Sequence, residues 1–354
     1  MFPFPAGGYL CFHMRIAIEI SNRKYRLTPN EIFFLDKCFQ LLLNNYPEHE
    51  WITNPFEETK GVISLLPMGI KMKLLLDRLN PQLLITSGEV YKKSSTNYRQ
   101  IFFYNQAYEP LKKESGGLQH PDLIITTSEV LKKKIIGSYQ LNEEKVRVIP
   151  AAPADDISLA DWSEKLSVKD RYSDGRDFFL CFKQIGANSN WEEILKAFSI
   201  FKKWQQSSFR LLIVAEIEPG YKEAFNEKFA SYKYRADVKI LDPEVDDVNR
   251  ILPVAFGLIC ADADYTGMNL LNGFVAEVPL ICSPLELFDE EVSGAFLPAI
   301  SSADELSRQL INLYRDEQLR EVIVAKGKQM LSKFSWEQTV EKWKRCLSIE
   351  VAGN

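Results

Sequence analysis

Short apolar runs alternate with amphipathic segments of helical periodicity along most of the chain. Continuous apolar runs are typical of strands that are buried on both faces, and a parallel sheet needs a helix between each strand and the next. No other feature of the sequence constrains the fold as strongly, and it predicts α/β domains with parallel sheets. The expected strands are 15–20, 83–86, 101–104, 123–126, 146–149, 178–182, 210–214, 238–241, 257–261 and 279–282.

Helices are expected between these strands and after the last of them. Thr28 is a good N-cap residue and Pro29 suits the first helical position, so the first helix should begin there. The expected helices are 28–45, 70–79, 129–138, 191–205, 221–231, 245–251, 269–276, 303–315, 317–333 and 336–348.

The length of 354 residues exceeds the usual size of one domain, so two domains are expected. Residues 153–177 are the least periodic stretch and separate two alternating series of strands and helices, so we interpret them as an interdomain link. Doubly wound sheets bind ligands at the carboxyl ends of their strands, so two such Rossmann-like domains with a cleft between them are the predicted architecture. The expected division is a lead segment 1–13, a first domain 14–152, a link 153–177, a second domain 178–334 and a terminal helix 335–354.

Charge is divided unevenly between the two halves. Residues 14–150 carry 19 basic and 15 acidic side chains, a balance of +4, and the chain from residue 151 carries 24 and 33, a balance of −9. Such counts bear on partners and solubility rather than on fold. Because the whole chain is acidic and has no motif that reads RNA or DNA, a nucleic-acid partner is not expected.

Cysteine and histidine usage argues against a metal site and for a reducing compartment. The six cysteines are scattered with no C-x-x-C pair, and three histidines are too few for a histidine-rich centre. No apolar stretch approaches the length of a membrane-spanning helix. Residues 1–13 are apolar but lack a basic n-region and a clear cleavage signature, so an upstream start and a disordered lead both remain open. We therefore expect a cytoplasmic protein.

Several segments occur in the order found in one enzyme family. They are 146–150 (VRVIP), the turn and helix 182–198, the strand 210–215, the block 264–283 that ends in VPLICS, and 334–337 (FSWE). In this order they resemble the retaining glycosyltransferases of family four, or group one, which have the two-Rossmann-domain GT-B fold. The resemblance covers about residues 146–347, and the first domain only by general layout. It implies that the terminal helix crosses back toward the first domain.

The resemblance implies a donor site in the second domain. Asp264 aligns with the first of two family carboxylates and Asn272 with the second, which contact the donor sugar and the ribose hydroxyls. Backbone N–H groups at the start of the following helix would hold the diphosphate. The residues in that role are Gly267, Met268, Asn269 and Leu270. The alternative is that Gly267 only makes the turn from strand to helix.

The residues that should neutralise the donor phosphates depart from the family pattern. Gln184 stands where the family has Arg, and Ser189 stands where it has Lys; Gly186 lies in the turn between them. Lys183 is one position early, and neighbouring residues of a strand point to opposite faces. Lys183 is therefore either a shifted phosphate contact or an ordinary solvated lysine.

The first domain is assigned to the acceptor. Asn105 follows the strand 101–104, where the family has His near the reaction centre; its amide is no general base but can orient a sugar hydroxyl. The turn 21–24 (SNRK) lacks the usual glycines. Lysine pairs at 92–93 and 112–113 and the triplet 132–134 are consistent with a face that meets anionic lipids at the inner membrane surface, or with a solvated helix face.

Two hypotheses follow. In the first, the protein is an enzyme that moves a hexose-type sugar from a nucleotide-sugar donor to a glycan or lipid-linked acceptor with retention, as in cell-surface polysaccharide biosynthesis, without a metal or other cofactor. In the second, it is a degraded glycosyltransferase-like subunit that binds a partner glycosyltransferase, because two expected phosphate-binding cations are missing.

Overall fold

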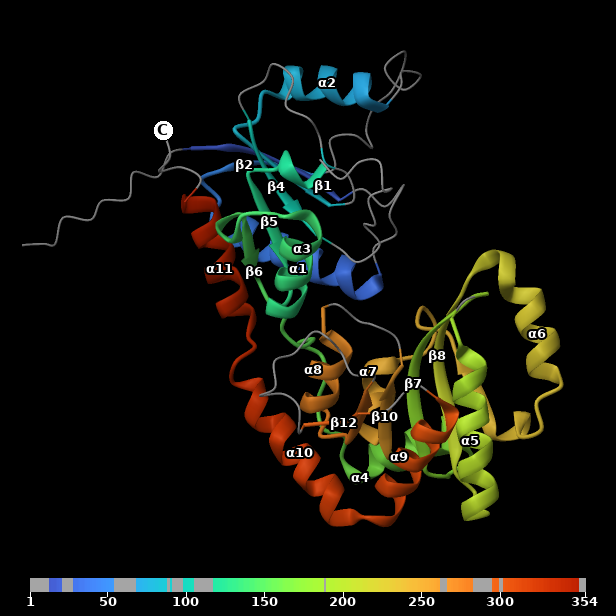
Figure 1. The fold of residues 1–354 in the computed structure, drawn as a ribbon. Helices are drawn as coiled ribbons and strands as arrows, with labels where there is room; N and C mark the ends of the chain where they lie inside the picture. Colours follow the sequence, from blue (N-terminus) through green and yellow to red (C-terminus); the bar gives the residue numbers. More distant parts are fainter. Residues whose placement is uncertain are drawn as a thin grey trace, which may run out of the picture. The chain divides into compact units, whose positions relative to one another are not determined.

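The structure is a computed structural model that describes residues 13–20, 28–53, 68–87, 90, 98–104, 117–187, 189–261, 266–282, 295–298 and 302–349. The chain forms two compact units, each with its own parallel sheet (Figure 1). Unit 1 consists of residues 1–150 and 337–354, and unit 2 of residues 151–336.

Unit 1 is built on a six-stranded parallel sheet with the strand order β2-β1-β3-β4-β5-β6. Its strands are β1 (Arg15–Ile20), β2 (Glu50–Thr53), β3 (Leu83–Ser87), β4 (Arg99–Phe103), β5 (Leu123–Thr126) and β6 (Val146–Val148). Its helices are α1 (Pro29–Asn45), α2 (Met68–Leu79), α3 (Glu129–Tyr139) and α11 (Trp336–Ile349), with the 3₁₀ turns η2 (Gly117–Gln119) and η3 (Glu143–Lys145).

The last helix of the chain belongs to the core of unit 1. Trp343 of α11 is fully buried and its ring lies 5.7 Å from that of Phe39 on α1. The Thr339 hydroxyl donates a hydrogen bond of 2.8 Å to the backbone oxygen of Pro150. On α1 Thr28 is the N-cap and Pro29 the first helical residue, as the sequence predicts, and a capping box between Thr28 and Glu31 is also present.

Unit 2 is a second six-stranded parallel sheet, with the order β12-β11-β10-β7-β8-β9. Its strands are β7 (Phe178–Ile185), β8 (Arg210–Ile217), β9 (Val238–Leu241), β10 (Gly257–Cys260), β11 (Leu280–Cys282) and β12 (Leu297–Pro298). Its α-helices are α4 (Trp162–Ser173), α5 (Trp191–Gln205), α6 (Lys222–Ala230), α7 (Val248–Ile251), α8 (Met268–Val275), α9 (Ala303–Arg315) and α10 (Glu317–Leu331). Its 3₁₀ turns are η4 (Pro219–Tyr221), η5 (Arg235–Asp237) and η6 (Leu252–Val254).

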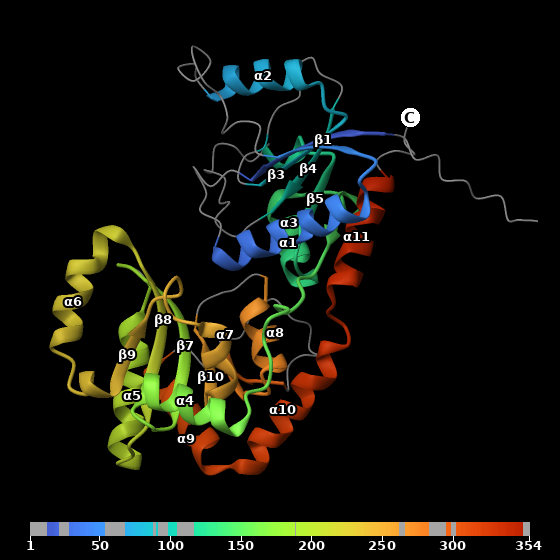
Figure 2. The same ribbon diagram turned by 180° about the vertical axis from the view of Figure 1, so that it is seen from behind.

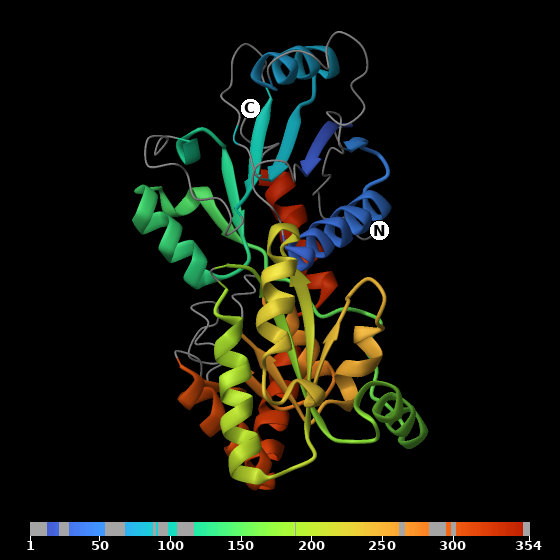
Figure 3. The same cartoon turned by 90° about the vertical axis from the view of Figure 1, so that its right-hand side faces the viewer.

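Both faces of this sheet are covered, as continuous apolar strands require. Residues of α4, α7 and α8 pack on one face, where Phe178 and Leu180 of β7 point. Residues of α5, α6 and α9 pack on the other face, with Phe179 and Cys181. Figure 2 shows α4 and α8 from one side, and Figure 3 shows α5 and α6 in front of the strands.

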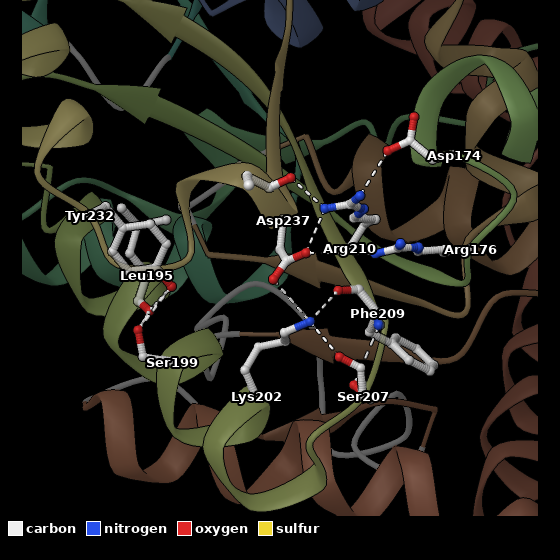
Figure 4. A network of polar contacts seen from close by, with 11 residues as sticks. Asp174, Arg176, Leu195, Ser199, Lys202, Ser207, Phe209, Arg210, Tyr232 and Asp237 are labelled. Carbon is white, nitrogen blue, oxygen red and sulfur yellow. Dashed lines mark hydrogen bonds and ion pairs between the residues drawn. The ribbon is translucent and has the colours of Figure 1, made fainter.

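A network of ion pairs, buried at Lys202 and Arg210 and exposed at Asp174, lies at the amino edge of the unit 2 sheet (Figure 4). Lys202, near the end of α5, donates to the backbone oxygen of Phe209 at 3.2 Å and pairs with Asp237 at 3.1 Å. Arg210, the first residue of β8, pairs with Asp237 at 2.5 Å and with Asp174 at 2.8 Å. The network joins α5, β8 and the segment before β9 at the edge opposite to the carboxyl ends of the strands.

The elements differ from the sequence predictions in four places. The stretch 153–177, predicted as a link, contains α4, whose Val168 and Tyr172 are buried in the unit 2 core; its other positions are mostly polar, so no apolar periodicity marks it. The strands β2 and β12 were not predicted, because each is a short edge strand. The expected helix 245–251 begins three residues later, as α7, because Asp247 is its N-cap and accepts a hydrogen bond from the Arg250 N–H. Among the described residues, no helix is long and apolar enough to cross a membrane.

Candidate functional site

The strand order of unit 2 places a topological switch point between β7 and β10. The chain runs outward from β7 to β8 and β9, then returns to the other side of β7 with β10. Neighbouring strands whose connections leave in opposite directions mark the topological switch point, where α/β sheets bind ligands. The turn from β7 to α5 and the connection from β10 to α8 therefore meet at this edge. Both were predicted as donor-binding segments.

The turn after β7 bonds the backbone of Gly186 to the side chain of Ser189. The backbone N–H of Gly186 donates to the Ser189 hydroxyl at 2.8 Å, and that hydroxyl lies 2.9 Å from the Gly186 backbone oxygen. A helix-opening turn binds an anion through backbone N–H groups that point outward. In this turn one of those donors is already used by Ser189, the residue that stands in place of the expected lysine.

A carboxylate of the neighbouring strand lies against the same glycine. A Cβ atom added to Gly186 would lie 2.3 Å from Cδ of Glu218 and within 2.5 Å of both its carboxylate oxygens. Glu218 directly follows β8, and its own backbone N–H donates to the Ile185 oxygen at 2.9 Å. A glycine is therefore required at 186 for the side chain of Glu218 to lie where it does. Glu218 was not among the residues predicted from the sequence.

Lys183 and Gln184 point to opposite faces of the sheet. Lys183 follows the alternation of Phe179 and Cys181, which face α5, α6 and α9, and its side chain is only 8% exposed. Gln184 follows Phe178 and Leu180 toward the face of α8, and its side chain is exposed. Gln184, and not Lys183, is thus on the face of the sheet that is covered by α8, the helix whose start was predicted to hold the diphosphate.

The start of α8 has the backbone geometry of a strand-to-helix turn. Gly267 precedes the helix with φ of +71°, a left-handed conformation that favours glycine. The backbone N–H of Met268 donates to the Thr266 hydroxyl at 3.2 Å, and the side chains of Met268 and Leu270 are buried. These two residues can therefore offer only backbone groups to a ligand, while Asn269 is half-buried.

Asn272 has a structural partner in unit 2. Its side-chain oxygen accepts a hydrogen bond of 2.9 Å from the backbone N–H of Ala154. The indole N–H of Trp336 donates to the backbone oxygen of Pro153 at 2.9 Å. Asn272 thus helps to hold the first residues of unit 2 against α8. Its amide oxygen retains a second lone pair, so the predicted ribose contact stays a prediction.

Comparison with solved structures identifies the architecture. No protein-family model matches the sequence, and the search of curated proteins finds no match. The structure resembles Anabaena HepE in complex with UDP and glucose at a TM-score of 0.70 and 14% identity, over 95% of this chain and 100% of that one. It also resembles a glycosyltransferase from Rickettsia africae at a TM-score of 0.71 and 13% identity, over 97% and 100% of the two chains. WaaG, a glycosyltransferase involved in lipopolysaccharide biosynthesis, matches at a TM-score of 0.66 and 11% identity, over 96% and 100%.

The chain has the GT-B fold.

The two parallel-sheet units and the agreement over nearly the whole of both chains confirm the fold predicted from the sequence.

Two residues predicted for the GT-B reaction centre lie outside the described residues. They are Asp264, between β10 and α8, and Asn105, which follows Tyr104 after β4. Among the described residues, no group of three His, Cys, Asp or Glu side chains is arranged to hold a metal ion.

One signal for Glu218 was present in the sequence. The apolar run 211–215 is followed at once by Glu216 and Glu218, and a parallel strand brings its carboxyl end to the ligand edge. What the sequence alone could not supply is the register, in which Gln184 lies beside Glu216 and Ile185 beside Ile217. That register fixes Glu218 beside Gly186.

Proposed function

We propose that this GT-B protein is a nucleotide-sugar-dependent glycosyltransferase, with the donor bound in unit 2. The observation that carries the proposal is the pair of glycine turns, Gly186 after β7 and Gly267 before α8, at the switch point of the unit 2 sheet. HepE, which shares the fold over nearly its whole length, is described in complex with UDP and glucose and with UDP-glucose.

Five of the predicted residues of unit 2 have a task in this proposal. The backbone of Gly267, Asn269 and Leu270 would bind the diphosphate at the start of α8, and Asp264 would accept hydrogen bonds from the sugar hydroxyls. Gln184 would contact the leaving diphosphate as a neutral donor. Retention of configuration and a hexose donor belong to the same proposal and derive from the sequence resemblance.

The acceptor is proposed to be a glycan or a lipid-linked glycan that binds unit 1, with Asn105 orienting its hydroxyl. The lysine triplet of α3 supports a lipid surface only in part. Lys132 is paired with Glu143 at 3.2 Å and is largely buried, whereas Lys133 and Lys134 are exposed. A cytoplasmic protein with peripheral contact at the inner membrane surface is the setting that we propose for this transfer, in cell-surface polysaccharide biosynthesis.

A second function is favoured by a specific observation. The predicted donor turn carries Gln184 and Ser189 where cations are expected, and Glu218 lies against it. Preorganised cations that stabilise a leaving diphosphate contribute several kcal/mol to catalysis, so their loss is consistent with a non-catalytic subunit that binds a partner glycosyltransferase.

A calorimetric screen of the whole chain tests the first proposal. UDP, GDP, ADP, CMP and their sugar conjugates are titrated against the native chain and against Asp264→Ala. We expect selective binding of one nucleotide-sugar, weakened about tenfold in Asp264→Ala by the loss of hydrogen bonds to a charged acceptor. Asp170→Ala, an exposed aspartate on α4, is the matched control and should bind as the native chain does.

The result that would overturn the proposal is the absence of heat from every nucleotide and nucleotide-sugar at millimolar concentration. Incubation of the best-bound conjugate with cell-extracted lipid-linked glycans then separates the two functions. Transfer of label supports the enzyme, and binding without transfer supports the partner subunit.

A further inference from the structure

The carboxylate of Glu218 lies against Gly186, in the turn that should receive the donor phosphates. Its carboxylate group would collide with any Cβ at position 186, so it fills the space that the missing side chain of Gly186 leaves open. A glycine in such a turn normally lets a ligand approach the backbone. In this protein the side chain of Glu218 lies against the backbone of Gly186 instead.

The position of Glu218 is fixed by backbone contacts on both sides. Its N–H donates to the Ile185 oxygen at 2.9 Å, which extends the β7–β8 pairing by one step, and its own oxygen accepts from the Tyr221 N–H at 2.8 Å. The 3₁₀ turn η4 therefore holds Cα of Glu218 beside the turn. Only the side-chain torsions are left to move, and the side chain is exposed.

Among the described residues of the turn and of the end of β7, no cation lies on the same face of the sheet as this carboxylate. Gln184 is neutral, the Ser189 hydroxyl is bonded to Gly186, and Lys183 belongs to the opposite face of the sheet. A diphosphate at Gly186 would therefore meet a like charge at close range. Coulomb repulsion between partly exposed charges a few ångströms apart changes binding constants by about an order of magnitude.

We propose that Glu218 sets the affinity of the Gly186 turn for its ligand, by excluding phosphate unless the carboxylate is displaced. This inference rests on the proposed donor site in unit 2. It makes Glu218 a specificity-determining residue. The carboxylate weakens the binding of every anionic ligand at the Gly186 turn, and it weakens the binding of donors with fewer phosphate charges to a smaller extent.

The test compares the whole chain with Glu218→Gln, which keeps the shape of the side chain and removes its charge. Binding of UDP, GDP and ADP is measured by calorimetry at about 50 mM and 500 mM salt. We expect Glu218→Gln to bind the preferred nucleotide about five- to tenfold more tightly at low salt. The gain should shrink at high salt, because screening weakens the repulsion in the native chain. A merely structural role of Glu218 would not produce this salt dependence.

Glu321→Gln is the matched control, since it removes the same charge from unit 2 at an exposed position of α10. It should leave every affinity unchanged. Equal or weaker binding by Glu218→Gln, with clear binding by the native chain, overturns the inference and leaves the donor site standing. Binding by Glu218→Gln alone supports the inference and identifies the native chain as the non-catalytic form. If no chain binds any nucleotide, the proposed function and this inference both fail.

Discussion

Gln184 is the residue at which the family pattern and this sequence differ most directly. It is exposed near the end of β7, on the same face of the sheet as α8 and one strand away from Glu218. An arginine there would place a planar cation where a neutral amide now stands. Arginine binds phosphate through two parallel N–H···O bonds, which an amide cannot do.

Gln184→Arg should therefore strengthen binding of the preferred nucleoside diphosphate by about tenfold, measured by calorimetry on the whole chain. Gln329→Arg adds the same charge at an exposed position of α10 and should change nothing. An equal gain in both variants would mean that the added charge acts through the whole unit and not through this turn.

At the scale of single residues, the sequence predicted the glycines but not their surroundings. Gly186 and Gly267 could be found because glycines that follow apolar strands mark turns. The partners of Gly186 could not be found, since Glu218 reaches it only through the pairing of β7 with β8. Asn272 is a similar case: its contact with Ala154 joins residues 118 positions apart.

At the scale of elements, apolar periodicity located nearly every strand and helix to within a few residues. The reason is that the positions buried in a strand or an amphipathic helix recur with a period that can be read from the sequence. It missed α4, whose buried side chains are few, and the edge strands β2 and β12. It also could not foresee how helices are joined. The Lys202 network joins α5 to β8 and β9 through residues that, in the sequence, are ordinary surface charges.

Asp237 is the acceptor shared by both cations of that network. Asp237→Asn should lower the free energy of unfolding by about 2–3 kcal/mol, because Lys202 and Arg210 would lose the carboxylate that they share in a largely buried site. Urea denaturation measures the change. Glu192→Gln makes the same substitution in an exposed pair with Lys228 and should cost less than about 1 kcal/mol. Equal losses would show that burial adds nothing to the network.

Tyr232 connects the end of α6 to α5 and gives this region a pH dependence. Its hydroxyl donates to the Leu195 oxygen at 2.8 Å and accepts from Ser199 at 2.9 Å (Figure 4). Burial raises the pKa of Tyr232 to about 12, above the value of about 10 in an unfolded chain. The neutral hydroxyl therefore stabilises the fold fully below pH 10, and this contribution is lost as the pH rises toward 12.

Tyr232→Phe should cost about 1 kcal/mol of unfolding free energy at pH 8, the value of one hydrogen bond. Between pH 10 and 12 the native chain should lose stability more steeply than the variant, so the two curves converge. Tyr234→Phe, in the same loop, is the control. Parallel curves over the whole range would contradict the raised pKa of Tyr232.

At the scale of the whole molecule, the uneven charge follows the two units. Unit 1 carries a formal balance of +4 and unit 2 a balance of −9. The acidic unit is the one proposed to bind an anionic donor. Glu218 is one of its acidic residues and lies at the edge of the sheet where the donor is proposed to bind. The resemblance implied that the terminal helix crosses back toward the first domain, and α11 lies in unit 1; the sequence did not indicate that α4 belongs to unit 2.

The return of α11 to unit 1 supplies the last prediction. Trp343 is fully buried against Phe39, so Trp343→Ala should cost about 3–5 kcal/mol, the usual loss for a large aromatic removed from a core. Trp162→Ala makes the same change on α4, where the side chain is 76% exposed, and should alter stability little. Unit 2 keeps its own core, so the unfolding of unit 2 and any nucleotide binding by it should persist in Trp343→Ala. Native-state hydrogen exchange, read separately for peptides of β1–β6 and β7–β11, measures both effects. Faster exchange confined to unit 1 is the expected result, and equal acceleration in both units would show that the two cores do not fold independently.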